Sequence, residues 1–219
     1  RERNLYYVDK TMYLKELEAQ PDSLFFIRPR RFGKSLFISM LRAYYDKAMA
    51  GKFDKLFSDL WVGQHPTPLK NRYQILYLDF SRVGGDIAHL SENFDQYFSM
   101  QMDFFIHKYK ADYPDFVVDM VLAAQKGDYK LNIITSQANE LGIPLYLIID
   151  EYDNFTNIVL NEEGEEVYHA ITHASGFYRE LFKKFKGTFE RIFMTGVSPV
   201  TLDDLTSGFN IGTNYSLSA

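Results

Sequence analysis

The sequence predicts an α/β fold in which helices cover both faces of a parallel β-sheet. Two observations predict it. Four short segments are almost continuously apolar, which is typical of strands buried on both faces of a parallel sheet. Longer segments between them carry an apolar residue at every third or fourth position, which is typical of amphipathic helices. Strands that alternate with helices form right-handed crossovers, and such crossovers give a parallel sheet.

The expected strands are residues 23–27, 75–80, 145–150 and 191–196. The first lies between Pro21 and Pro29 and is too short for a helix. The third is apolar until Asp150, which marks its carboxyl end. Ligands of parallel sheets bind beyond the carboxyl ends of the strands, so polar residues at these ends are the first candidates for a functional site.

The expected helices are residues 34–50, 87–109, 116–125, 129–141 and 167–185, with a further helix beginning at Ser198. In the first of them the apolar positions form one face, and Gly51 provides a stop signal. In the second, apolar residues recur every three or four positions from Ile87 to Tyr109. Ser198 and Pro199 have the order of an N-cap and a first helical residue.

Length and composition limit the classes of protein to consider. The chain has 219 residues, and we expect 1–219 to form a single domain on which residues 1–22 pack as an N-terminal extension. The net charge of −5 does not favour a nucleic-acid surface. The absence of cysteine excludes thiolate zinc sites, cysteine nucleophiles and disulfides. No apolar run is long enough to cross a membrane and no signal segment opens the chain, so we expect a cytoplasmic protein.

The segment from Arg28 to Ser35 (RPRRFGKS) joins the first expected strand to the first expected helix, which is the context of a phosphate-binding loop. Amides at a helix N-terminus attract an anion, Lys34 can reach the outer phosphates, and the Ser35 hydroxyl can bind Mg²⁺. The segment departs from the general pattern G-x-x-x-x-G-K-[ST], because Arg28 stands at the first glycine position. The candidate nucleotide-binding residues are Arg28, Pro29, Arg30, Arg31, Phe32, Gly33, Lys34 and Ser35.

A phosphate-binding loop needs acidic partners, and Asp150 and Glu151 lie at the tip of the third expected strand. Asp150 can hold Mg²⁺ together with Ser35, and Glu151 can orient or deprotonate an attacking water. The alternative is a strand that simply ends in a polar turn. The strand, loop and helix around Lys34 favour the functional interpretation.

Other residues at the strand ends have two interpretations each. Thr195 could contact the terminal phosphate or position the water, or it could be an ordinary strand-end threonine. Asp79 could act in the same way or cap the turn at Ser81. The three arginines of the loop are either phosphate contacts or surface charges. His169 and His173 are four residues apart but lack the glutamate of H-E-x-x-H, so no zinc hydrolase is predicted.

Five segments together resemble the bacterial AAA-ATPase-like family. They are residues 7–11 (YVDKT), 28–35 (RPRRFGKS), 77–81 (YLDFS), 148–153 (IIDEYD) and 195–199 (TGVSP). The family signature has an arginine in place of the first glycine, so Arg28 departs from the general pattern and not from the family. From the residues alone, Asp9-Lys10-Thr11 indicates only a helix start near Thr11.

The resemblance implies a P-loop NTPase core of the additional-strand type, with Walker A and Walker B motifs and the strand order 5-1-4-3-2. It also implies ATP and Mg²⁺ as cofactors, and a glutamate beside the aspartate that binds Mg²⁺. Family members commonly carry a C-terminal nuclease-like domain of the PD-(D/E)xK kind. Neither that domain nor a fifth strand is evident before Ala219, so we expect the chain to be the N-terminal part of a longer protein.

The expected function is therefore Mg²⁺-dependent ATP binding with slow hydrolysis, coupled to a C-terminal effector domain. Lys34, Glu151 and Thr195 are the expected catalytic residues, and Ser35 and Asp150 the expected metal ligands. One alternative is a regulatory or scaffold module that binds nucleotide without useful turnover. Another is a nucleic-acid-binding module that uses the basic cluster. The arginine finger is not assignable, and a second subunit of a homo-oligomer or the missing C-terminal part could supply it.

Overall fold

The fold is built on a five-stranded parallel sheet. The computed structural model describes residues 8–29, 31–83, 89–154, 157, 177–197 and 213–214. The strands are β1 (Ser23–Ile27), β2 (Gln74–Asp79), β3 (Leu145–Asp150), β4 (Arg191–Gly196) and β5 (Thr213–Asn214). Their order across the sheet is β2-β3-β4-β1-β5, and all neighbouring strands are parallel. The predicted α/β fold with a parallel sheet is confirmed.

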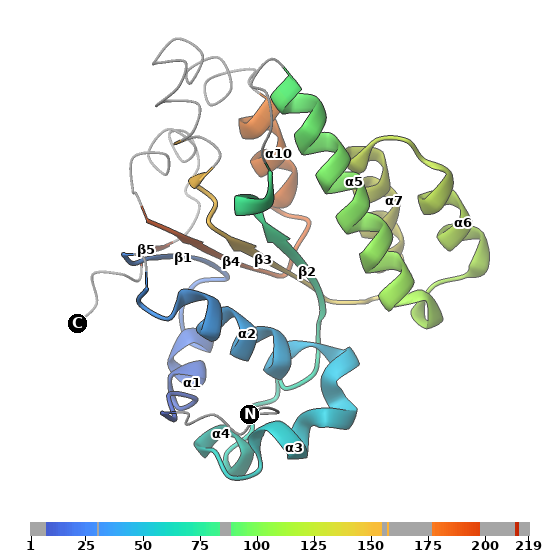
Figure 1. Cartoon of the computed structure of the whole chain (residues 1–219). Coiled ribbons are helices and arrows are strands. Elements are labelled where there is room, and N and C mark those ends of the chain that lie inside the picture. The colour runs from blue at the N-terminus through green and yellow to red at the C-terminus, as the bar shows by residue number, and fades with distance from the viewer. Residues whose placement is uncertain are drawn as a thin grey trace.

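Helices cover both faces of this sheet (Figure 1). One face carries α1 (Tyr13–Glu18), α2 (Lys34–Tyr45), α3 (Phe53–Phe57) and α4 (Trp61–Gln64), with the 3₁₀ helix η1 (Lys47–Lys52) between α2 and α3. The other carries α5 (Leu90–Lys108), α6 (Asp115–Ala123), α7 (Gly127–Glu140) and α10 (Phe177–Phe185). Two short 3₁₀ helices, η2 (Phe80–Arg82) and η4 (Lys110–Asp112), follow β2 and α5.

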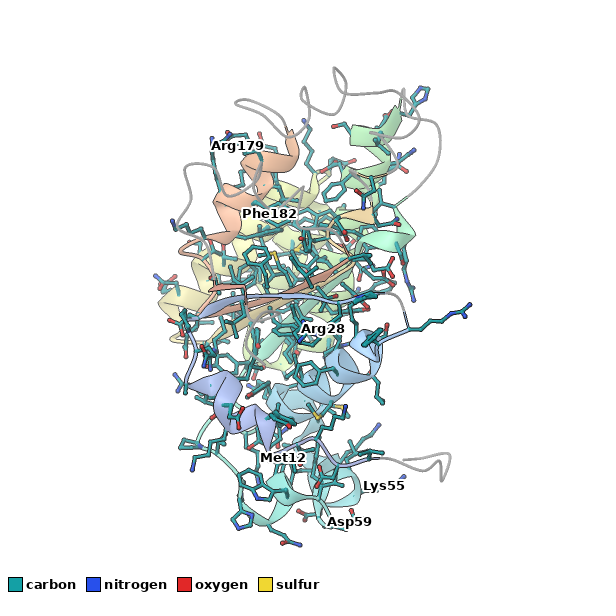
Figure 2. All side chains as sticks on the ribbon, turned by 90° about the vertical axis from the view of Figure 1, so that its left-hand side faces the viewer. Met12, Arg28, Lys55, Asp59, Arg179 and Phe182 are labelled. Atoms are coloured by element: carbon teal, nitrogen blue, oxygen red, sulfur yellow. The ribbon has the colours of Figure 1, made fainter. Side chains whose placement is uncertain are left out.

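Each strand supplies side chains to two separate cores, because successive residues of a strand point to opposite faces. In β3, Ile148 belongs to the core under α2, whereas Ile149 belongs to the core under α5 and α10. Figure 2 shows the two layers from the side, with Phe182 on one side of the sheet and Met12 on the other. Residue parity therefore decides which face a strand-end side chain takes.

The predicted helix over residues 34–50 is wrong in its length. The α-helix ends at Tyr45, because Asp46 adopts an extended backbone (φ −72°, ψ 120°) and its Oδ1 accepts a hydrogen bond from Ala48 N at 2.8 Å. Asp46 also receives hydrogen bonds from Lys108 and Tyr109 of the opposite layer. These long-range partners hold the break, while the apolar period of the sequence continues past it.

The other expected elements differ mainly at their ends. The predicted helices at 116–125 and 129–141 are α6 and α7, which begin one and two residues earlier. Residues 87 and 88 of the predicted helix 87–109, residues 167–176 of the predicted helix 167–185, and the helix expected at Ser198 lie outside the described residues. A fifth strand, which is not evident from the sequence, is present, because Thr213 and Asn214 pair with Leu24 and Phe25.

Helix α5 closes the outer edge of β2. The Tyr109 hydroxyl accepts a hydrogen bond from Ile75 N at 2.8 Å, and the Tyr97 hydroxyl accepts one from Asp79 N at 2.7 Å. These amides point away from β3, and an edge strand normally leaves such groups to solvent. Two tyrosines from one helix thus satisfy both ends of the edge strand.

The Asp9-Lys10-Thr11 segment ties the N-terminal part of the chain to α4. The Asp9 carboxylate accepts hydrogen bonds from Thr11 and, at 2.7 Å, from Trp61 N. Thr11 Oγ1 accepts a hydrogen bond from Val62 N at 3.1 Å. Because Leu60, the N-cap residue of α4, makes no side-chain cap, Asp9 and Thr11 cap that helix from a distant part of the sequence.

Candidate functional site

Three polar side chains form one row at the carboxyl edge of the sheet. The register pairs Asp79 with Asp150, and Ile149 with Met194, so the next residues, Asp150 and Thr195, are also side by side. Each of the three lies two positions after a strand residue of the core under α2. Because side chains alternate along a strand, all three lie on the α2 face of the sheet. The row therefore lies on the face where the first turn of α2 meets the sheet.

The loop from Arg28 to Gly33 joins β1 to α2 at this edge. The backbone is left-handed at Arg31 (φ 68°) and at Gly33 (φ 77°). Gly33 is the N-cap of α2 and has no side chain, so the amides of the first turn receive no side-chain cap. Such uncapped amides at the positive end of a 12-residue helix favour an anion.

The Lys34 side chain folds back over this loop. It is buried, with 6% of its surface exposed, and its Nζ donates hydrogen bonds to Arg28 O at 2.8 Å and to Pro29 O at 3.2 Å. Main-chain carbonyls carry only partial charges, so phosphate oxygens would be stronger acceptors for this ammonium group. The loop holds Lys34 in place with contacts that a nucleotide could replace.

Ser35, Asp150 and Thr195 meet below the loop. Ser35 Oγ lies 3.5 Å from Asp150 Oδ2, and Thr195 Oγ1 donates a hydrogen bond to Asp150 Oδ1 at 2.5 Å. Asp150 is 6% exposed and Thr195 is fully buried. The structure thus brings together both expected metal ligands, and it directs the Thr195 hydroxyl at Asp150.

The oxygens of Ser35 and Asp150 are of the kind that Mg²⁺ prefers. Mg²⁺ usually binds only one or two protein ligands and completes its shell with water and phosphate, so this pair fits the ion. No group of three His, Asp or Glu residues able to hold a metal occurs in the described part of the chain. His169 and His173 lie outside that part.

Glu151 follows Asp150 with a left-handed backbone, at φ 51°. Of the three non-glycine residues with positive φ in the described ranges, Arg31 and Glu151 both lie at this edge. Such conformations cost of order 1 kcal/mol and persist where neighbouring residues enforce them. The strain is concentrated where the sequence predicts chemistry.

One of the three loop arginines, Arg28, already has partners. Arg28 donates a hydrogen bond to Ile27 O at 3.2 Å and stacks 4.9 Å from the ring centroid of Phe26. Arg31 is exposed, as is Phe32, which has 69% of its surface accessible. Arg30 lies outside the described residues. Both interpretations of these arginines therefore stay open.

Asp79 caps the turn that follows β2. Its Oδ1 accepts hydrogen bonds from Ser81 N at 3.2 Å and Ser81 Oγ at 2.6 Å, and its Oδ2 pairs with Arg82 Nε at 3.0 Å. The capping alternative is thus the one the contacts favour. Burial, with the charges of Asp79 and Asp150, raises the pKa of the neighbouring Tyr77 to about 12, so its hydroxyl stays protonated.

Comparison with known proteins agrees with this geometry. A model of the family described as AAA-ATPase-like, predicted AAA-ATPase, matches residues 1–206. The chain belongs to this predicted AAA-ATPase family. No curated protein and no solved structure gives a significant match. The resemblance seen in the five sequence segments is confirmed.

Three residues that pack beside the candidate site of this predicted AAA-ATPase were not singled out from the sequence. Tyr152 and Asp153 follow Glu151 and are 0% and 1% exposed, and Gly196 ends β4 beside them. Two acids three positions apart in IIDEYD are a signal that could have pointed to Asp153. Nothing in the local sequence indicates that Gly196 must lack a side chain.

No helix in the described part of this predicted AAA-ATPase has the length and apolar character needed to cross a lipid bilayer.

Proposed function

We propose that this predicted AAA-ATPase binds Mg²⁺-ATP at the carboxyl edge of the sheet and hydrolyses it slowly. The observation that carries the proposal is the meeting of Ser35, Asp150 and Thr195 directly below the uncapped N-terminus of α2. The order β5-β1-β4-β3-β2 supports a P-loop NTPase fold of the additional-strand type. We assign residues 1–219 to one such domain.

Each residue has a distinct task in the proposed reaction. The amides of Gly33, Lys34 and Ser35 would bind the phosphates, and Lys34 would exchange its two loop carbonyls for phosphate oxygens. Ser35 and Asp150 would hold Mg²⁺, which neutralises phosphate charge when bound. Thr195 would keep Asp150 oriented through its hydrogen bond and would also sense the terminal phosphate.

Glu151 would supply the general base. It would accept a proton from the water whose oxygen attacks the γ-phosphorus, while the bond from that phosphorus to the β–γ bridging oxygen breaks and ADP leaves. The left-handed backbone of Glu151 supports this role, because strained conformations of non-glycine residues cluster at active sites.

The first test is a thermal melt with and without Mg²⁺-ATP. A ligand at a hundredfold excess over Kd stabilises the native state by about 2.7 kcal/mol, which raises the Tm of a domain this size by about 5–10 °C. We expect Lys34→Ala to lose this shift and Lys110→Ala, an exposed lysine beyond α5, to keep it. A folded wild-type protein without any shift would contradict nucleotide binding.

Turnover is tested separately with Glu151→Gln. This variant keeps the shape of the side chain but not its basicity, so ATP affinity should stay near the wild-type value. The hydrolysis rate should fall by about 100-fold or more. Equal rates for Glu151→Gln and the wild-type protein would show that Glu151 is not the base.

A second function, nucleotide binding without useful turnover, is favoured by one observation. Three arginines described near this edge are engaged elsewhere, since Arg28 stacks on Phe26, Arg42 on Tyr77 and Arg82 pairs with Asp79. If the exposed Arg31 of the loop makes no phosphate contact, transition-state charge would need an arginine from a second subunit or from an effector domain. Tight binding with negligible turnover in the full-length protein would favour this regulatory role.

A further inference from the structure

Three segments of the chain meet at Gly196. Gly196 O accepts a hydrogen bond from Arg28 N at 3.2 Å, which ties the start of the phosphate-binding loop to the end of β4. Tyr152 N donates to Thr195 O at 3.0 Å, which ties the turn after β3 to the same point. We call the contacts among Tyr152, Asp153, Gly196 and Val197 the Gly196 junction.

Gly196 must lack a side chain for the junction to close. A Cβ atom on it would lie 2.4 Å from Cε1 and 2.9 Å from Cδ1 of Tyr152, and 2.9 Å from Asp153 Oδ1. Cβ atoms in real proteins essentially never make non-bonded contacts under 3.0 Å, and Tyr152 is fully buried and cannot retreat to solvent. The Tyr152 ring also packs edge-on against Phe25 of β1, with centroids 5.8 Å apart.

Asp153 joins the turn after β3 to Val197, the residue that follows β4. Its Oδ2 accepts a hydrogen bond from Val197 N at 2.9 Å and a longer one from Asn157 Nδ2 at 3.4 Å. Asp153 is only 1% exposed, and a buried carboxylate is costly unless it accepts hydrogen bonds. The need to keep these hydrogen bonds constrains the orientation of the Asp153 side chain. The chain leaving β4 therefore starts from a point fixed by the turn after β3.

These contacts hold Glu151 from both directions. Asp150 is fixed by Thr195 and Ser35 on the α2 face, while Tyr152 is fixed by Thr195 O and Phe25 on the opposite face. With both neighbours anchored, the backbone between them has little freedom, which explains how Glu151 keeps φ 51° without being glycine.

We propose that Asp153 and Gly196 are positioning residues, which fix the Glu151 backbone between Asp150 and Tyr152 and link the phosphate-binding loop to Val197, which follows β4. This inference rests on the proposed function of the site. It adds that the fourth residue of the Asp150–Asp153 turn acts through its neighbours and never contacts the nucleotide.

The deciding experiment compares Asp153→Ala with Asp153→Asn. Asparagine keeps an oxygen that can accept from Val197 N, whereas alanine does not. We expect the Kd for a fluorescent ATP analogue with Mg²⁺ to stay within about threefold in both variants. The single-turnover hydrolysis rate should fall about 100-fold in Asp153→Ala, as expected for a misplaced catalytic group, and recover to within about fivefold in Asp153→Asn.

Outcomes separate this inference from the proposed function. If the wild-type protein does not bind Mg²⁺-ATP, the proposed function fails, and the inference with it. If the wild-type protein binds and hydrolyses but Asp153→Ala keeps its rate, only the inference is overturned. Equal losses of binding and turnover in both variants would show a structural role and would also overturn it.

Amide hydrogen exchange on the wild-type protein gives a second readout, which needs neither hydrolysis nor a folded variant. The link from loop to junction predicts that Mg²⁺ with a non-hydrolysable ATP analogue slows exchange at Tyr152 and Val197 as well as at Lys34 and Ser35. Slower exchange confined to Lys34 and Ser35 would contradict the link.

Discussion

The two edges of the same sheet hold their buried polar groups in different ways. At the amino edge, the buried polar side chains form hydrogen bonds with other groups of the protein. Asp46 accepts from Lys108, Tyr109 and Ala48 N, and Gln74 contacts both Asp112 and Tyr113. At the carboxyl edge, Lys34 binds main-chain carbonyls, and Ser35 is 3.5 Å from Asp150.

This difference separates stability from function. The contacts at the amino edge join the ends of α2 and α5 to the start of β2, so losing one of them leaves a buried group without its partner. The contacts at the carboxyl edge are ones that a ligand could replace. We therefore expect substitutions at the amino edge to change the free energy of unfolding, and those at the carboxyl edge to change binding and turnover.

The largest effect on stability is expected from high pH. Burial raises the pKa of five tyrosines that surround the amino edge, namely Tyr45, Tyr73, Tyr109, Tyr113 and Tyr146. Above pH 10 the unfolded chain loses these protons while the folded chain keeps them, so the free energy of unfolding falls as pH rises. Each tyrosine contributes about 1.4 kcal/mol per pH unit, and the sum is several kcal/mol.

Urea titrations at pH 9, 10 and 11 would measure this slope. Tyr113→Phe should reduce it, and Tyr129→Phe, which changes an exposed tyrosine, should leave it unchanged. A stability that is flat to pH 11 would contradict the burial of these hydroxyls.

The next largest effect is expected from Asp46→Ala. The change removes the acceptor of Lys108, Tyr109 and Ala48 N, and the protein should lose about 3 kcal/mol in its free energy of unfolding. Affinity for Mg²⁺-ATP should not change. If Asp46→Ala instead weakened binding at unchanged stability, the division between the two edges would be wrong.

Tyr97 of α5 and Tyr109, the C-cap residue of that helix, allow a direct comparison of the two edges. Tyr109 bonds Ile75 N and Asp46, whereas Tyr97 bonds Asp79 N. We expect Tyr109→Phe to cost about 2 kcal/mol and Tyr97→Phe about 1 kcal/mol, because the first leaves a buried carboxylate with one donor fewer. Chemical denaturation would measure both losses in the free energy of unfolding. Equal losses would show that the hydrogen bond from Tyr109 to the Asp46 carboxylate does not contribute to stability.

The smallest change in stability is expected at Asp150. In Asp150→Asn the amide oxygen can still accept from Thr195, so the free energy of unfolding should move by less than about 1 kcal/mol. The increase in ATP affinity on adding Mg²⁺ should be lost. Calorimetric titration of ATP with and without Mg²⁺ would measure it, and an unchanged Mg²⁺ effect would exclude Asp150 as a ligand.

The sequence was sufficient for four of the five strands and for the polar residues at their carboxyl ends, but not for β5. The strand ends Asp150 and Thr195 were predicted because apolar runs reveal parallel strands, and parity then places both side chains on one face. Local periodicity could not reveal the break at Asp46, because partners more than 60 residues away hold it. The same holds for Asp9, whose carboxylate caps a helix 52 residues away.

The two tyrosine hydroxyls on the edge of β2 also affect how molecules of this protein meet in solution. An exposed edge strand offers free amides to a strand of another molecule, which is a common start of aggregation. Here Ile75 N and Asp79 N are already bonded within the chain, so β2 offers an incoming strand few partners. Concentrated protein should resist association through β2, and Tyr97→Phe with Tyr109→Phe should make it more prone to aggregate before it loses its fold.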